Sequence, residues 1–199
     1  CKLSVFFFSS SHLYNNYLLS YNILNSIFKS QYTKNDFGKQ YARRIVRRMN
    51  MEIYDSLLKA VHDEYDTLRV LKKSARGEVS LVRHRESGTR YIFRHFEGSS
   101  EVYQLLLGLS CRNLPQIMEV GEKDGRTALL EEYVQGDTLG EILEGGVLTT
   151  GQAKQIGRQL CSALWVLHSR GIVHRDVKPD NVILRGSEAV LIDFDASRI

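Results

Sequence analysis

The segment from His174 to Asn181 brings together side chains that could transfer a phosphoryl group. It reads His-Arg-Asp-Val-Lys-Pro-Asp-Asn, and Asp193 follows twelve residues after Asn181. Phosphoryl transfer depends on positioning and on neutralising charge, so it needs few side chains, but these must converge. Asp176 could orient an attacking hydroxyl and accept its proton, and Lys178 could neutralise charge on the γ-phosphate. The amide oxygen of Asn181 and the carboxylate of Asp193 could hold magnesium ions.

A surface loop of mixed charges could carry some of these letters by chance, but six fixed letters and the spacing to Asp193 occur together here. The segment resembles the catalytic loop of the eukaryotic-like serine/threonine protein kinases, and we expect a bacterial member. The resemblance covers residues 65–199 and is strongest over 160–195. It implies that Asp176 is the catalytic base. It also implies that Lys178 contacts the γ-phosphate, as is typical of the serine/threonine branch.

The same resemblance implies the cofactors and partners. ATP would be the phosphate donor, a protein with a Ser or Thr hydroxyl would be the acceptor, and Asn181 and Asp193 would bind Mg²⁺. His174 would support the loop. The segment around Glu132 and Val134 looks like the hinge between two lobes, where backbone groups of these two residues would hydrogen-bond the adenine.

The elements around this segment predict an α+β, two-lobed, kinase-like fold, with a small five-stranded antiparallel lobe and an incomplete helical lobe. Alternating apolar residues and turn residues indicate the strands. The predicted strands of the small lobe are Leu68–Leu71, Glu78–Arg83, Arg90–Phe96, Gln116–Glu122 and Thr127–Val134. A helix is predicted over Ser100–Leu109, and residues 123–126 are expected to close a hairpin.

Two helices of the larger lobe carry start signals. Thr138 with Glu141, and Thr149 with Gln152, have the spacing of capping boxes. The second helix has an apolar stripe that we expect to be buried. The stripe consists of Ile156, Leu160, Leu164 and Leu167. We also expect Trp165 in the core.

Two short strands are predicted after the catalytic segment, over Val182–Leu184 and Ala189–Ile192, with a turn between them. A strand pair of this length reverses the chain direction. It would return Asp193 to the neighbourhood of Asp176.

The chain is expected to divide into four regions, ending before the activation segment of the larger lobe. On that expectation, these 199 residues by themselves would be marginally stable and would transfer phosphate poorly. The regions are 1–48, a poorly ordered arm or upstream sequence; 49–64, a helical lead-in; 65–134, the small lobe; and 135–199, the start of the larger lobe with the catalytic loop.

The phosphate-binding elements of the small lobe depart from the family pattern. The glycine-rich loop keeps only its third glycine, Gly77, followed by Val79. Lys72 and Ser74 stand at the other two glycine positions. Arg94 stands where the family has a lysine for the α- and β-phosphates. Arginine keeps the charge but is longer, planar and forked, so the exchange is not neutral.

Three acidic residues complete these departures. Glu101 is the expected helix partner of Arg94, although it lies about one residue out of register. Glu131 falls at the gatekeeper position, which is usually apolar or Thr, and taken alone it reads as an exposed strand residue. Asp195 replaces the glycine that usually follows Phe194 and gives that turn its freedom.

Three functions remain open on this sequence. The first is an ATP- and magnesium-dependent serine/threonine protein kinase, favoured by the complete set of base and metal residues. The second is a pseudokinase, a nucleotide-binding or scaffold module, favoured by Arg94 and the depleted glycine-rich loop. The third is a small-molecule phosphotransferase, because an Asp-Phe-Asp ending such as the one at Asp195 also occurs in that class.

Composition limits the other classes of function. A net charge of +4 is too mild to indicate a nucleic-acid partner, and no apolar run reaches the roughly 18–20 residues of a membrane span. Three scattered cysteines favour a reducing, cytoplasmic location over a disulfide framework or a zinc site. Four arginines share one side of a predicted helix, and we interpret them as a solvated face rather than a patch for lipid or nucleic acid. They are Arg43, Arg44, Arg47 and Arg48.

Overall fold

The computed structural model describes residues 36–199, and the chain divides into two compact units after Met49. The described part of the first unit belongs to helix α2 (Asp36–Glu64), on which the four arginines of the predicted basic face are exposed. The prediction of a poorly ordered arm over 1–48 falls largely on residues outside the described ones. Residues 36–48 are helical, since apolar Ile45, Val46 and Met49 recur among the arginines at helical spacing.

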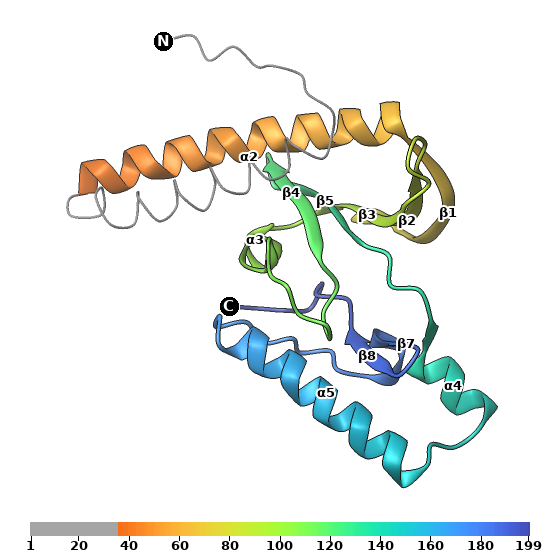
Figure 1. The fold of residues 1–199 in the computed structure, drawn as a ribbon. Coiled ribbons are helices and arrows are strands. Elements are labelled where there is room, and N and C mark those ends of the chain that lie inside the picture. The colour runs from red at the N-terminus through yellow and green to blue at the C-terminus, as the bar shows by residue number, and fades with distance from the viewer. Residues whose placement is uncertain (1–35) are drawn as a thin grey trace. The chain divides into compact units, whose positions relative to one another are not determined.

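The second unit contains a five-stranded antiparallel sheet, as the sequence predicts (Figure 1). The order of its strands is β1-β2-β3-β5-β4, so β3 lies at the centre between β2 and β5. The strands are β1 (Tyr65–Ser74), β2 (Gly77–His84), β3 (Arg90–Glu97), β4 (Ile117–Lys123) and β5 (Arg126–Glu132).

The predicted hairpin between β4 and β5 is confirmed, with Asp124 and Gly125 as its two-residue turn. Both residues have positive φ, 50° and 76° respectively. Such a turn matches the twist of the flanking strands and favours Asp-Gly, because glycine adopts positive φ without a steric cost. The hairpin sets the register that places β5 beside β3.

The second half of α2 packs on this sheet within the second unit. Tyr54 and Leu57 are buried together with strand residues Val82, Ala128 and Leu130. The hydroxyl of Tyr54 also makes a 2.7 Å hydrogen bond with Nε2 of His95 on β3, and Lys123 Nζ lies 2.7 Å from Asp55 Oδ2. Residues 50–64 are therefore helical and part of the second folded unit.

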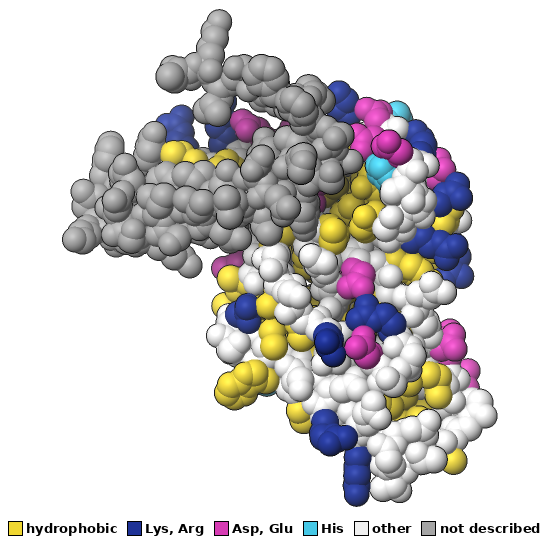
Figure 2. All heavy atoms as spheres, viewed as in Figure 1, with side chains coloured by type: hydrophobic (Ala, Val, Ile, Leu, Met, Phe, Trp, Pro, Cys, Tyr) yellow, Lys and Arg dark blue, Asp and Glu magenta, His cyan; other side chains and the backbone are white. Residues whose placement is uncertain are grey.

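Basic and acidic side chains lie side by side over β1 and β2 (Figure 2). Arg83 and Arg85 both bond the carboxylate of Asp66, at 3.1 and 2.9 Å, and Lys73 Nζ lies 3.0 Å from Glu78 Oε2. These pairs are solvent-exposed, so each contributes little to the free energy of unfolding. Charges of both signs thus alternate on this edge of the sheet.

Helix α3 (Glu101–Leu106) is shorter than the predicted Ser100–Leu109. It stops because Leu107 leaves the helical region at φ −58° and ψ 127°, pairing with Ile117 of β4, and Gly108 follows with φ 73°. Tyr103 and Leu106 are the residues of α3 that are buried. The helix therefore presents only one turn and a half to the sheet.

The remainder of the second unit holds a small three-stranded sheet and two helices. Both predicted capping boxes are confirmed, at Thr138 with Glu141 and at Thr149 with Gln152. The elements are β6 (Asp137–Thr138), α4 (Leu139–Gly145), α5 (Thr150–His168), the 3-10 turn η1 (Pro179–Asn181), β7 (Val182–Arg185) and β8 (Glu188–Leu191). No helix among residues 36–199 is long and apolar enough to cross a membrane.

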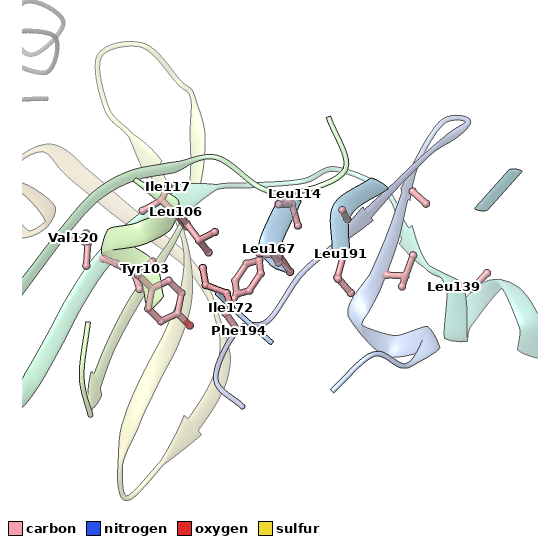
Figure 3. Close-up of a cluster of buried hydrophobic side chains, with 14 of the residues drawn as sticks. Tyr103, Leu106, Leu114, Ile117, Val120, Leu139, Leu167, Ile172, Leu191 and Phe194 are labelled. Atoms are coloured by element: carbon pink, nitrogen blue, oxygen red, sulfur yellow. The ribbon is translucent and has the colours of Figure 1, made fainter. Parts of the chain in front are cut away.

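One apolar core joins α3 and β4 to α5 and the segments after it (Figure 3). Its members include Tyr103, Leu106, Leu114, Ile117, Leu167, Ile172, Leu191 and Phe194. Of the predicted stripe on α5, Ile156 and Leu167 are buried, while Leu160 and Leu164 are partly buried. Because Phe194 belongs to this core, the core fixes the residues on either side of it.

The prediction that Trp165 lies in the core is wrong, because 75% of this residue is exposed. Trp165 follows Ile156 by nine residues, which is two and a half helical turns. It therefore lies on the opposite side of α5 from the buried stripe.

The carboxyl group of Glu119 on β4 titrates near neutral pH. Burial, and to a lesser degree the charge of Glu64, raises the pKa of Glu119 from 4.5 to about 7. The folded state therefore binds this proton more tightly than the unfolded chain, and this stabilisation is lost as pH rises from 4.5 through about 7. We expect the free energy of unfolding to fall by up to about 3 kcal/mol over that range.

The substitution Glu119→Gln should remove that dependence, as measured by urea denaturation at pH values from 5 to 8. The variant should be more stable than the wild type at pH 8, because no buried carboxylate then has to ionise. Equal slopes of stability against pH in the two proteins would contradict this assignment.

Candidate active site

His174 anchors the start of the catalytic segment. It is 1% exposed, its Nε2 lies 3.1 Å from the carbonyl oxygen of Ile192, and its Nδ1 lies 3.3 Å from the backbone nitrogen of Asp176. A carbonyl only accepts a hydrogen bond and a backbone N–H only donates one, so the two bonds together require a neutral ring protonated at Nε2. Burial also lowers the pKa of His174. A neutral His174 thus ties the catalytic segment to the strand end that precedes Asp193.

The stability of the fold should depend on pH through His174. Because its pKa is lower in the folded state than the unfolded value of 6.5, the unfolded chain binds more protons below pH 6.5. The free energy of unfolding should therefore decrease as pH falls below 6.5, with a slope approaching about 1.4 kcal/mol per pH unit. The change in slope caused by His174→Gln, measured by chemical denaturation from pH 5 to 8, isolates the contribution of His174. An unchanged slope would show that His174 does not titrate on unfolding.

Asp176, Lys178 and Asn181 converge on one carboxylate. Oδ2 of Asp176 accepts hydrogen bonds from Lys178 Nζ and from Asn181 Nδ2, both at 2.9 Å. The Lys178 bond is the main reason why the pKa of Asp176 lies below its ordinary value, and the same bond raises the pKa of Lys178. At neutral pH this site therefore holds an ionised carboxylate with an ammonium beside it.

Asp193 returns to this group through the strand pair β7 and β8, as the sequence predicts. The backbone nitrogen of Ile192 donates to the carbonyl oxygen of Asn181 at 2.9 Å, which places the two segments side by side. Asp193 has a positive φ of 67°, and Arg175 in the catalytic segment has one of 69°. Among the described residues with a side chain, Asp124 alone shares this conformation. Such backbone strain concentrates at functional sites.

Arg94 lies at the centre of a buried ionic network. It is 6% exposed, its Nε donates to Glu131 Oε1 at 2.8 Å, and its Nη1 lies 3.4 Å from Asp193 Oδ1. Burial alone would lower the pKa of Arg94, but the charge of Glu131 and its neighbours outweighs burial and raises the pKa. Arg94, which is predicted to contact the nucleotide phosphates, thus contacts Asp193, which is predicted to bind the metal ion.

The expected partnership of Arg94 with Glu101 is wrong. Glu101 begins the six-residue helix α3 and is exposed, while the carboxylates bonded to Arg94 come from Glu131, Asp193 and Asp195. The interpretation of Glu131 as an exposed strand residue is wrong too, because it is only 4% exposed. The positive charge of Arg94 on the neighbouring strand compensates the Glu131 carboxylate, which explains how Glu131 can be buried.

Asp195 belongs to the same ionic network as Arg94. From the sequence, it is interpreted only as the replacement of a glycine. Its Oδ1 accepts from Arg94 Nη1 at 3.2 Å and from the hydroxyl of Tyr103 at 3.1 Å, and its Oδ2 lies 3.5 Å from Lys72 Nζ. Lys72 itself replaces a glycine of the loop. Two residues that depart from the family pattern, far apart in sequence, therefore contact each other.

The remaining predicted site residues lie along β2 and β5. Val79 is paired with Lys72 on one side and with Arg94 on the other, so the three form one cross-strand row. Gly77 is needed for packing, because a Cβ there would lie 2.5 Å from the carbonyl oxygen of His95 on β3. The close approach of β3 therefore explains why position 77 is a glycine.

Of the two predicted hinge residues, Glu132 is the last residue of β5 and Val134 lies just beyond it. The side chain of Glu132 accepts a 2.6 Å hydrogen bond from Arg185 of β7, and Val134 is buried. The end of β5 is thus tied by Arg185 to the strand pair that precedes Asp193.

Comparison with known proteins gives this arrangement a family. The protein kinase domain family matches residues 65–199, which include every site residue described above. The chain belongs to the protein kinase family. The matched residues 65–199 contain both sheets and the segment from His174 to Asn181.

Curated relatives of this kinase chain include bacterial serine/threonine-protein kinases. It is 38% identical over 112 residues to serine/threonine-protein kinase D of Synechocystis sp., covering 55% of this chain and 21% of that protein. It is 30% identical over 160 residues to serine/threonine-protein kinase pkn2 of Myxococcus xanthus, covering 73% of this chain and 19% of that protein. It is 29% identical over 157 residues to serine/threonine-protein kinase PknA of Nostoc sp., covering 68% of this chain and 28% of that protein. The chain thus spans about a fifth of the length of the first two.

The donor atoms of Asn181 and Asp193 fit the magnesium ion that the protein kinase family uses with ATP. Nδ2 of Asn181 is committed to the backbone oxygen and the carboxylate of Asp176, both at 2.9 Å, which leaves its amide oxygen as an acceptor. Asp193 offers a carboxylate from the neighbouring segment. Mg²⁺ commonly takes one or two such protein oxygens and completes its shell with phosphates and water.

Two contacts were not predicted from the sequence, namely the buried pair of Arg94 with Glu131 and the contact of Lys72 with Asp195. One signal was available, since each pair consists of two charged residues of opposite sign at positions where the family has other residue types. Such paired replacements indicate that the two positions lie close together in the fold.

Proposed function

We propose that the intact protein transfers the γ-phosphate of ATP to a Ser or Thr hydroxyl of a protein substrate. The observation that carries this proposal is the convergence of Lys178 and Asn181 on the ionised carboxylate of Asp176. The family relationship supports it, since the bacterial relatives named above are serine/threonine-protein kinases.

Each side chain of the catalytic segment has a defined task in this proposal. Asp176 orients the acceptor hydroxyl and takes its proton at the carboxylate, which Lys178 keeps ionised. The ammonium of Lys178, which is hydrogen-bonded to Asp176, neutralises charge on the transferred group. Asn181 and Asp193 hold Mg²⁺, which supplies charge neutralisation on the phosphates when it is bound.

The nucleotide is held by the small lobe in this proposal. Backbone groups of Glu132 and Val134 bond the adenine, and Gly77 and Val79 cover the nucleotide from β2. Arg94 meets the α- and β-phosphates. We take residues 65–134 and 135–199 as the two lobes that enclose ATP, and we propose a cytoplasmic location on the basis of the scattered cysteines.

A pseudokinase is the second candidate, and one observation favours it. Arg94 and Asp193, the proposed metal ligand, are 3.4 Å apart, and a guanidinium on that carboxylate competes with a metal ion. In this case the protein would bind nucleotide or serve as a scaffold without transferring phosphate.

The decisive experiment follows label from [γ-³²P]ATP in the presence of Mg²⁺. The intact protein is incubated with itself, with a generic protein acceptor, and with a panel of sugars and aminoglycosides. Label on Ser or Thr supports the proposal. Nucleotide binding without transfer to any acceptor supports the pseudokinase, and label on the small molecules alone indicates a small-molecule phosphotransferase.

A further inference from the structure

The pair of Arg94 and Glu131 is built entirely within the central sheet. In the register of β3 and β5, Glu131 lies opposite Ile92 and Arg94 lies opposite Leu129. Because side chains alternate between faces along a strand, Arg94 and Glu131 are diagonal neighbours on the same face. Diagonal neighbours lie within reach of long side chains, and here Nε and Oε1 are 2.8 Å apart.

Helix α3 offers Arg94 no carboxylate. Its one acidic residue, Glu101, is exposed in the first turn, and α3 reaches the network through the hydroxyl of Tyr103 on Asp195 instead. In protein kinases the cation of β3 is ordinarily held by a glutamate from the helix that follows. In this chain, α3 has no acidic side chain bonded to Arg94.

The shape of arginine explains why it accompanies Glu131. The guanidinium has three nitrogens spread over a rigid plane, whereas a lysine presents a single ammonium. Here Nε is held by Glu131, and Nη1 is shared by Asp193 and Asp195. No described residue is hydrogen-bonded to Nη2. One nitrogen therefore remains for an anionic ligand while the other two are fixed.

We propose that Glu131 is a positioning residue, which holds Arg94 for the phosphates of the nucleotide in place of a helix glutamate. This inference rests on the proposed nucleotide-binding function. Its consequence is that the cation stays in place whatever α3 does, because both partners belong to adjacent strands. A displacement of α3, which would separate a cation on the sheet from a glutamate on the helix, leaves this pair intact.

The experiment compares two ligands, ATP and adenosine, in calorimetric titrations of the intact protein. Glu131→Gln keeps the size of the side chain but removes its charge, and Glu101→Gln is the matched control. We expect Glu131→Gln to weaken ATP binding about tenfold, as for the loss of one charge-assisted hydrogen bond. Adenosine, which lacks phosphates, should bind that variant within about twofold of the wild type. Glu101→Gln should change neither affinity.

Each possible outcome decides the matter. An equal loss of ATP and adenosine binding would show that Glu131 only supports the fold, and unchanged ATP binding would show that it does not position Arg94. If the wild type binds neither ligand, the proposed function fails and this inference fails with it.

If Glu131→Gln shows no cooperative melt, the double variant Arg94→Met/Glu131→Met replaces it, because removing both charges avoids an uncompensated buried one. Its ratio of ATP to adenosine affinity should fall by a similar factor. An unchanged ratio would overturn the proposal.

Discussion

Replacing Asp176 with alanine should reduce phosphoryl transfer by about 10²–10⁴-fold, because the substitution removes the carboxylate that accepts the proton. It also removes the acceptor that binds Lys178 Nζ and Asn181 Nδ2, each at 2.9 Å. The rate of label transfer from ATP measures the effect. Nucleotide binding should be much less affected, since the adenine and the phosphates contact other residues in the proposed site.

Asp180 provides a matched control within the same segment. It is another carboxylate near Lys178, but it is exposed and lies outside the hydrogen bonds that converge on Asp176. Asp180→Asn should keep the rate within about threefold of the wild type, as for an exposed polar exchange. Retention of full activity by Asp176→Ala would remove Asp176 from the mechanism.

Gly121→Ala should destabilise the second unit by about 3 kcal/mol, through overpacking against backbone that cannot rotate away. A Cβ at position 121 would collide with the backbone nitrogen of Tyr54 and would lie 2.6 Å from its Cα. The helix would have to move away from β4, which exposes Tyr54 and Leu57. Urea denaturation followed by circular dichroism measures the loss, and faster proteolysis of α2 would reveal the displacement.

Gly157 on α5 is the control for this substitution. Nothing lies within 4 Å of a Cβ built there, and the residue is exposed. Gly157→Ala should therefore stabilise the protein by up to about 1 kcal/mol, the difference in helix propensity. If Gly121→Ala proves as well tolerated as Gly157→Ala, the close approach of α2 to β4 is not needed for stability.

Local chemistry made much of the fold predictable. The capping boxes at Thr138 and Thr149 form as predicted because their bonds join residues three apart. The turn at Asp124 and Gly125 forms because two adjacent residues carry its unusual dihedrals. The convergence of Lys178 on Asp176 follows similarly from their separation by two residues.

Contacts between distant segments were harder to predict. Arg94 and Glu131 are separated by 37 positions, and Lys72 and Asp195 by 123, so no local pattern signals either contact. The expectation for Glu101 was wrong because it depended on a longer helix, whereas Leu107 ends α3. Only the alignment of β3 with β5 brings the guanidinium of Arg94 to the buried carboxylate.

The position of Trp165 decides which optical signals can report on this molecule. It is the single tryptophan of the chain, and 75% of it is exposed on α5. Its emission should already be red-shifted in the native state and open to quenching by acrylamide, so unfolding will change the spectrum little. A blue shift and protection from the quencher would instead report that another protein surface has covered this side of α5.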